Sequence, residues 1–340
     1  MDNNGSYFWT QDQWQHIVQR YQAGQLPHAL MLTGPAGLGK LQFARQLAQT
    51  LLCDTNRQVA SAQSINPPCG QCNGCHLMAA GTHPDFKLLV PEADGKQIPI
   101  DAVRETSQFL TLKSQFAPIQ IVIVAPAEAM NKYAANSLLK TLEEPTPDTL
   151  ILLVSSQPSR LLPTIRSRCQ TVEFSLPDRT EALSWLRAQK STADLQKHAE
   201  HLLALAGGAP VLALEFAQQG TLDIYQQLLS SLEKIAKKQA DPVMEAKRWE
   251  SAGLAQSVKW LYFWVSSLIR LKSGAGQVDN NAEWREPALD FLLQRLNIQQ
   301  LYRYLDLVNE SSRMINTQAN VQLTLEALLI SWSRLDSDLV

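Results

Sequence analysis

The stretch HALMLTGPAGLGKLQFARQLAQTLL, residues 28–52, decides the fold of the first half of the chain. Its apolar run ALMLT predicts a buried strand, and the apolar spacing of LQFARQLAQTLL predicts a helix. Between them, GPAGLGK matches G-x-x-x-x-G-K, a loop whose backbone N–H groups bind nucleotide phosphates. A strand, this loop and a helix in direct succession predict the phosphate-binding corner of an α/β domain.

Further strands and helices alternate along the first half of the chain. The additional strands are expected at residues 86–90, 119–124, 150–155 and 170–174. Most of these runs are apolar throughout, which is typical of strands buried on both faces of a parallel sheet. Helices are expected at residues 41–52, 101–112 and 134–144, with Asp101 as an N-cap. The pattern predicts a layered α/β domain.

The second half of the chain carries almost no strand signal. In residues 254–271 the apolar side chains recur every three or four positions, at Leu254, Val258, Leu261, Val265 and Leu268. This spacing predicts one buried face of a helix. Residues 323–335 predict another apolar helix, and the composition of residues 272–283 predicts a loop. The expected fold class is therefore α/β plus all-α.

Composition excludes some function classes. The chain has 340 residues, 45% hydrophobic and 18% charged, which suggests two or three globular domains. A net charge of −2 provides no general attraction to nucleic acid or membrane. The sequence shows no signal-peptide pattern and no apolar run of membrane-spanning length, so we expect a cytoplasmic protein. In that compartment, its five cysteines favour metal binding or free thiols over disulfides.

Four cysteines follow the spacing C-x15-C-x2-C-x2-C; they are Cys53, Cys69, Cys72 and Cys75. Short C-x2-C loops allow two thiolates to bind one tetrahedral ion, so the set predicts a structural Zn²⁺ site. The alternative is a group of unrelated thiols or a redox pair. Because four protein ligands leave no position for water, we expect no catalysis at this site.

The phosphate-binding loop is incomplete as an ATPase site. Leu41 stands where a Ser or Thr hydroxyl would hold Mg²⁺. Loop residues that remain able to bind a nucleotide phosphate are Gly34, Gly37, Gly39 and Lys40. Two interpretations stay open: ATP or ADP binds without turnover, or the glycines only form a tight turn.

The acidic residues of an ATPase are also missing. Ala125 and Pro126 follow strand 119–124, where an ATPase carries the acids that hold Mg²⁺ and polarise water. Glu128 lies beyond this proline, and we expect it to be a solvated residue at the start of a helix or turn. The combined losses argue against ATP hydrolysis by this chain.

Five motifs occur in a recognisable order: GPAGLGK, CGQCNGC, GTHPD (81–85), NSLLKTLEEP (136–145) and SRC (167–169). Together they resemble the clamp-loader AAA+ subunits of bacterial DNA polymerase III. The degenerate nucleotide site is more similar to a non-hydrolysing member than to the ATP-hydrolysing gamma/tau subunit. All the specific motifs lie within residues 29–169, and the helical half matches mainly in length and character.

The resemblance implies three domains. They are an AAA+ domain at 1–175 with its zinc module at 53–75, a helical lid domain at 176–216, and a helical C-terminal collar at 217–340. It also implies a stator-like role in a hetero-pentamer with gamma/tau and delta subunits, which loads the sliding clamp onto primed DNA. The chain would belong to the DNA polymerase III holoenzyme, a DNA-directed DNA polymerase and thus a nucleotidyltransferase, without being catalytic alone.

The resemblance also implies a role for Arg168 with Ser167. In this family, the arginine of SRC reaches the ATP of a neighbouring subunit, where a guanidinium stabilises charge on the γ-phosphate. Arg166 is the weaker candidate, and Cys169 is expected to be a small core residue. Val211 stands where hydrolysing members carry a nucleotide-sensing lid arginine.

Alternative interpretations remain open for Ser155 and for the charged residues of NSLLKTLEEP. Ser155 either contacts γ-phosphate, as its position in the family implies, or only caps the end of a strand, which we favour. In NSLLKTLEEP the leucines Leu138, Leu139 and Leu142 are expected in the core. The charged residues Lys140, Glu143 and Glu144 either contact a neighbouring subunit or form a solvated face.

Two other functions compete with a non-hydrolysing clamp-loader subunit. An active AAA+ ATPase of a clamp loader or related DNA motor would require Glu128 to replace the missing acids. A zinc-dependent nucleic-acid-binding module would use residues 53–75 as its reader. Against the second, CGQCNGC has no Lys or Arg between its cysteines, whereas phosphate-backbone binding requires basic residues.

Overall fold

The computed structural model describes residues 7–58, 66–93, 95–189, 193–273, 287–314 and 320–335. The chain divides into two compact units, residues 1–188 with 206–213, and residues 189–205 with 214–340. The first unit carries the sheet and the motifs, and the second is helical where it is described. The division into domains at 1–175, 176–216 and 217–340 stays a prediction.

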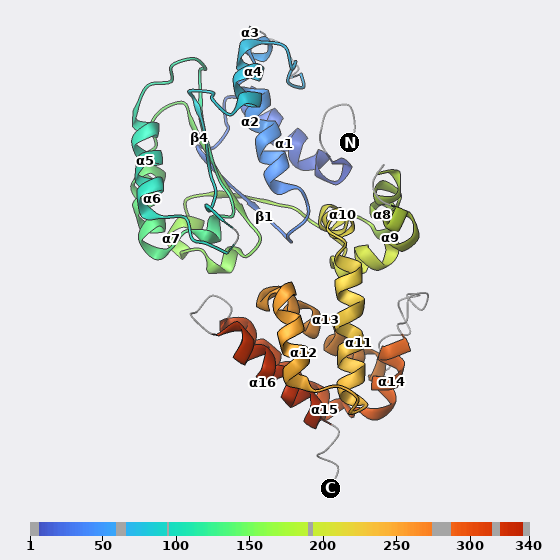
Figure 1. Cartoon of the computed structure of the whole chain (residues 1–340). Helices are drawn as coiled ribbons and strands as arrows, with labels where there is room; N and C mark the ends of the chain where they lie inside the picture. Colours follow the sequence, from blue (N-terminus) through green and yellow to red (C-terminus); the bar gives the residue numbers. More distant parts are fainter. Residues whose placement is uncertain are drawn as a thin grey trace. The chain divides into compact units, whose positions relative to one another are not determined.

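The first unit is built on a five-stranded sheet (Figure 1). Its strands are β1 (Ala29–Thr33), β2 (Phe86–Leu89), β3 (Gln120–Val124), β4 (Thr149–Ser155) and β5 (Gln170–Glu173). All described pairings are parallel, in the order β2-β3-β4-β1-β5. Every residue of β1, β3 and β4 is buried, as their continuous apolar runs require. The predicted α/β class is confirmed.

Helices cover both faces of this sheet (Figure 1). Leu30 and Leu32 of β1 pack in one core with residues of α1 (Gln11–Gln22) and α2 (Lys40–Leu51). Met31 points to the other core, because successive side chains of a strand alternate. Helices α5 (Ile100–Thr111), α6 (Lys132–Glu143) and α7 (Pro163–Arg166) supply that second core.

Several short elements complete the first unit. They are η1 (Phe8–Thr10), α3 (Asp54–Gln58), α4 (Asn73–Ala80), η2 (Ala127–Ala129), η3 (Pro158–Arg160) and α8 (Arg179–Ala188). The expected cap at Asp101 is wrong, because α5 already begins at Ile100 after Pro99. The proline has no N–H to leave unsatisfied at this helix start, and Asp101 lies in the first turn.

The second unit has a separate core of its own. Its helices are α9 (Ala193–Leu205), α11 (Thr221–Ala236), α12 (Pro242–Trp249), η4 (Glu250–Ala252), α13 (Leu254–Lys272), α14 (Pro287–Arg295), α15 (Ile298–Met314) and α16 (Val321–Arg334), while α10 (Pro210–Gln218) begins in the first unit. The predicted apolar face of α13 is buried in full. Most of the predicted loop at 272–283 lies outside the described residues.

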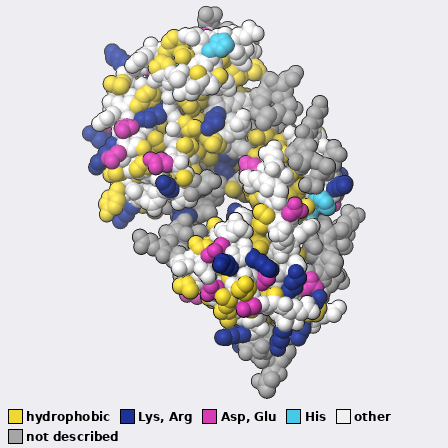
Figure 2. Space-filling view, in the orientation of Figure 1, with side chains coloured by type: hydrophobic (Ala, Val, Ile, Leu, Met, Phe, Trp, Pro, Cys, Tyr) yellow, Lys and Arg dark blue, Asp and Glu magenta, His cyan; other side chains and the backbone are white. Residues whose placement is uncertain are grey.

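No single helix in the described parts of the chain has the length and apolar character of a membrane span, and only a sharply bent pair, Lys197–Leu205 with Pro210–Gln218, meets that test jointly. On the face seen in Figure 2, Lys and Arg are interspersed with Asp and Glu.

Candidate functional site

The glycine-rich loop GPAGLGK joins β1 to α2, as predicted, but other side chains pack directly against it. Gly37 and Gly39 have φ angles of 76° and 77°, a region that favours glycine. A Cβ added at Gly37 would collide with Leu212, and one added at Gly39 would collide with the Tyr7 ring. The glycines therefore permit both the turn and the close approach of these side chains.

Lys40, the residue expected to contact phosphate, is bound within its own loop. Its Nζ donates to the carbonyl oxygens of Gly34 at 2.7 Å and Pro35 at 2.5 Å, and to Ser156 Oγ at 3.2 Å. The side chain is only 4% exposed. This burial lowers the pKa of Lys40 to about 8, against the opposing influence of the Glu128 carboxylate. The ammonium donors already have acceptors without any nucleotide.

An aromatic cluster lies beside the loop and was not identified from the sequence. The rings of Tyr7 and Trp9 stack at 4.7 Å, and Trp185 of α8 meets Trp9 edge-on at 5.2 Å. Trp9 Nε1 donates to the Leu38 carbonyl at 3.0 Å. Consecutive aromatic residues at positions 7–9 were the available signal, but their partner is distant in sequence.

The start of α10 also contacts the loop, because the Val211 N–H donates to the Gly37 carbonyl at 3.1 Å. A valine in place of the family's arginine thus offers a backbone group and an apolar side chain at this position, and no guanidinium.

The expectation of a solvated Glu128 is wrong. Glu128 does lie at a turn, in η2, but its Oε1 accepts the N–H groups of Ser156 at 2.9 Å and Gln157 at 3.1 Å. Its carboxylate therefore orders the chain after β4. Ser155, the last residue of β4, accepts the Gln157 N–H at 3.2 Å, which agrees with the favoured strand-capping role.

Arg168 lies just beyond α7 and is partly exposed. Its Nη2 is 2.7 Å from Glu143 Oε1, and its Nη1 donates to the Thr164 carbonyl at 3.0 Å and weakly to Ser167 Oγ at 3.4 Å. Arg166, on α7, is exposed and has no charged partner among the described residues. Burial raises the pKa of Cys169 to about 11, so this thiol stays protonated at neutral pH.

Helix α6 contains most of NSLLKTLEEP and faces the core as predicted. Leu138 and Leu142 are buried, and Leu139 packs against the same core. Lys140 and Glu144 are exposed. Glu143 is also exposed, and its carboxylate pairs with Arg168 of the same chain, which the sequence did not predict.

The four predicted metal ligands come together. Their Sγ atoms all lie within 4.8 Å of one another, with 3.8 Å between Cys53 and Cys72 and 4.0 Å between Cys69 and Cys75. Four sulfurs around one ion at about 2.3 Å would lie about 3.8 Å apart in a tetrahedron. The cluster therefore has a geometry that could hold a metal ion.

Backbone donors point at these sulfurs, as they do around thiolates. The Asp54 and Cys75 N–H groups donate to Cys72 Sγ at 3.4 Å, and the Cys72 N–H donates to Cys69 Sγ at 3.3 Å. Hydrogen bonds from Thr55 and from backbone N–H groups lower the pKa of Cys69 to about 6. Burial raises the pKa of Cys75, so that thiol requires a cation to become a ligand.

The GTHPD motif proves to be a structural clamp. Asp85 is fully buried, and its carboxylate accepts the N–H groups of Gln115 and Phe116 at 2.7 Å and of Ala117 at 2.5 Å. These residues connect α5 to β3. The sequence marked the motif, but the partners lie about thirty positions away and only the fold brings them together.

Replacing Asp85 with alanine is expected to lower the free energy of unfolding by about 3–5 kcal/mol, because three backbone donors lose a charged acceptor. Urea denaturation of the purified chain would measure this change. Asp85→Asn is the matched control, since its single amide oxygen retains part of the acceptor set. A loss below about 1 kcal/mol for the alanine variant would contradict the clamp role.

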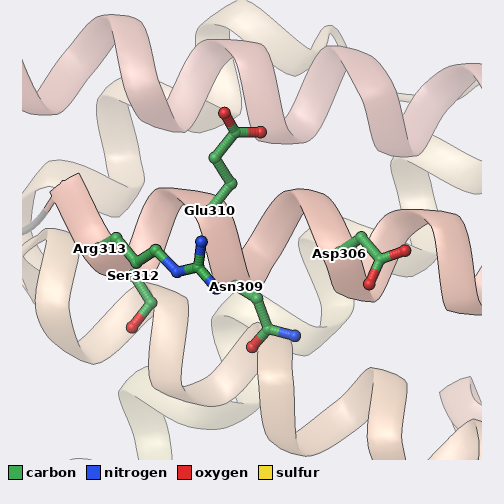
Figure 3. A pocket seen from close by; sticks show the side chains of 5 residues that line it. All are labelled: Asp306, Asn309, Glu310, Ser312 and Arg313. Carbon is green, nitrogen blue, oxygen red and sulfur yellow. The ribbon is translucent and has the colours of Figure 1, made fainter.

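A hollow of about 560 Å³ occurs on the second unit, lined by Asp306, Asn309, Glu310, Ser312 and Arg313. All five residues belong to α15, and Figure 3 shows Glu310 pointing away from Asn309 and Asp306. The side chains do not converge on one point, so this hollow lacks the arrangement of a binding site.

Comparison with known proteins matches both halves of the chain. A family model described as DNA polymerase III, delta subunit, matches residues 9–178, and one described as DNA polymerase III, delta subunit, C terminal, matches residues 219–334. A protein of Pseudomonas aeruginosa named DNA polymerase III subunit delta' is 36% identical over 336 residues, which cover 97% of this chain and 98% of that protein. The chain belongs to the DNA polymerase III delta prime family.

Other delta prime proteins agree with this assignment. Subunit delta' of Haemophilus influenzae is 35% identical over 78% of both chains, and that of Escherichia coli is 32% identical over 81% of this chain and 79% of its own. Among solved structures, a gamma subunit-related protein of Thermotoga maritima covers 94% of this chain with 99% of its own, at 19% identity and a TM-score of 0.44. The sequence relatives confirm the family resemblance inferred from the motifs.

Proposed function

We propose that this delta prime family member is a non-hydrolysing, stator-like subunit of the bacterial DNA polymerase III clamp loader. In this proposal it joins gamma/tau and delta subunits in a cytoplasmic hetero-pentamer, which loads the sliding clamp onto primed DNA. The three-domain division is part of the proposal, with residues 217–340 as the collar. The chain contributes to the polymerase holoenzyme without catalysing a reaction alone.

The observation that carries the non-hydrolysing role is the bonding of Lys40 to its own loop. Lys40 Nζ has three acceptors within the chain, and the Tyr7 ring packs on the loop at Gly39. An incoming phosphate would have to displace these contacts, and no hydroxyl at Leu41 would then hold its Mg²⁺. These features support a fold that resembles a nucleotide-binding domain but neither hydrolyses nor requires ATP.

The active-ATPase alternative is weaker on the same evidence. It would require Glu128 to polarise water, but Glu128 Oε1 already accepts two backbone N–H groups. A carboxylate that orders a neighbouring segment in this way has a structural use, and the other acid of an ATPase site is replaced by Ala125 or Pro126.

Purified chain alone is expected to show no ATP turnover above background, and Lys40→Ala should leave this baseline unchanged. The variant should lose about 1–2 kcal/mol of stability, because the Gly34 and Pro35 carbonyls lose their donor. Phosphate release and thermal unfolding are the measurements. Robust turnover that Lys40→Ala abolishes would establish the active-ATPase alternative instead.

The pH dependence of this stability difference has a definite sign. The pKa of Lys40 falls from 10.5 to about 8 on folding, so the unfolded chain binds more protons between these values. Stability of the wild-type chain should therefore rise relative to Lys40→Ala as pH increases through this window.

We further propose that Arg168 acts as an arginine finger, with Ser167 beside it, at the ATP site of an adjacent gamma/tau subunit. Its guanidinium is partly exposed and lies just beyond the short helix α7, from which it could contact a neighbouring subunit. A guanidinium supplied in trans stabilises the charge that develops on the γ-phosphate.

The cysteine cluster is proposed to hold one structural Zn²⁺. The sulfur spacings fit a tetrahedral site, and four protein ligands leave no position for a reacting water. In that role the ion links α4 to the segment that follows α2, because Cys53 comes after α2 and Cys75 lies in α4.

A further inference from the structure

The ion pair between Arg168 and Glu143 holds a guanidinium that is 35% exposed. One side of the group is fixed by Glu143 at 2.7 Å, and Nη1 is fixed by the Thr164 carbonyl at 3.0 Å. Within the described residues, the Nε–H of Arg168 has no acceptor. Arg168 therefore has a restricted orientation and still keeps a donor for an anion outside the chain.

Both partners of the pair are attached to buried anchors. Glu143 is the last residue of α6 and directly follows Leu142, which is buried in the same core as Ile165 of α7. Arg168 lies three positions after Ile165. Because the two helices share one packed core, the fold fixes the backbone positions of Glu143 and Arg168 relative to each other.

We propose that Glu143 is a positioning residue for Arg168, holding the guanidinium in one orientation before a neighbouring subunit presents its ATP. This inference rests on the proposed function of Arg168 as a finger. An arginine side chain loses much rotamer freedom when it binds, and the ion pair restricts those rotamers in the free chain. A preorganised donor loses less conformational entropy when it binds the phosphate than a mobile donor does.

The carboxylate does not block the guanidinium from a phosphate. Both partners are partly exposed, at 35% and 49%, and exposed ion pairs are weak. A γ-phosphate bears more negative charge than one carboxylate, and Arg168 has donors for both. Glu143 therefore directs the finger and can keep its own contact when the phosphate arrives.

The test uses the reconstituted clamp loader with gamma/tau and delta subunits, sliding clamp and primed DNA. ATP turnover is measured against ATP concentration for wild type, Glu143→Ala, Glu143→Gln, Arg168→Ala and the double variant Glu143→Ala/Arg168→Ala. Glu144→Ala is the matched control, because Glu144 is the exposed neighbour without a charged partner among the described residues. Thermal unfolding of each chain monitors folding.

Glu143→Ala is expected to lower kcat at the affected site about threefold to fivefold with little change in KM, because an exposed ion pair contributes about 0–1 kcal/mol and a misplaced catalytic group loses rate and not nucleotide binding. Glu143→Gln, which keeps an amide oxygen as acceptor, should retain part of the rate. The double variant should match Arg168→Ala, and Glu144→Ala should match wild type.

Each other outcome has a distinct meaning. If Arg168→Ala leaves turnover unchanged, the proposed finger itself is wrong. If Arg168→Ala lowers turnover but Glu143→Ala does not, or raises it, the positioning role is overturned while the finger stands. Effects of Glu143→Ala that add to those of Arg168→Ala would also overturn it, since a positioning residue has nothing to act on once Arg168 is absent.

Discussion

Arg168→Ala is expected to lower ATP turnover at one neighbouring site of the reconstituted complex by about 10³-fold or more, since fingers supplied in trans contribute about 10³–10⁵ in rate. The loss should appear in kcat, because the guanidinium acts on charge that develops in the transition state. The chain itself should fold normally, because its exposed ion pair with Glu143 contributes about 0–1 kcal/mol.

Rapid measurement of phosphate release would separate turnover at the affected site from turnover at sites that do not face Arg168. The expected result is a missing part of the first-turnover amplitude, together with slower clamp loading. Arg166→Ala is the control, because Arg166 is an exposed arginine of α7 two positions away. An unchanged amplitude for Arg168→Ala, or equal losses for both variants, would contradict the finger assignment.

Cys75→Ser is expected to abolish metal binding and to unfold the cysteine module. Cys75 is only 2% exposed, and a serine hydroxyl does not replace a thiolate as a zinc ligand. Structural zinc contributes about 10–16 kcal/mol of apparent binding free energy in zinc-finger peptides. Losing this free energy should therefore be enough to unfold a short module. The sheet has its own core and should remain folded.

Metal analysis should find about one zinc per wild-type chain and none in the variant. Limited proteolysis should then cleave between residues 53 and 80, and a chelator should produce the same cleavage in wild type. Cys169→Ala is the control, because its half-buried thiol lies outside the cluster. Metal-free wild type with unchanged protease resistance would contradict the zinc proposal.

Much of the first unit could be predicted from its apolar pattern. Strand β1 has the predicted bounds, and each of the other four strands differs from its predicted range by one residue at one end. The reason is physical, since a strand buried on both faces needs an unbroken apolar run. The wrong cap at Asp101 shows the limit, because a helix start depends on local backbone geometry that several sequences allow.

The site residues show more clearly that sequence spacing predicts local clusters but not distant contacts. The spacing of the four cysteines was enough to predict that they cluster, because three of them lie within seven positions and a small ligand set has few possible geometries. Spacing could not show that Glu128 orders the chain after β4 or that Glu143 pairs with Arg168. These partners lie 25 or more positions apart and meet only because the strands and helices pack.

The glycine-rich loop GPAGLGK illustrates what each level determines. The sequence by itself determined that a strand, a glycine loop and a helix follow one another, and that Leu41, Ala125 and Pro126 remove the ATPase groups, because these depend on residue type and local order. Only the tertiary structure decided where Lys40 directs its donors and that Tyr7 packs on the loop. A buried ammonium must find acceptors, and the fold determines which are within reach.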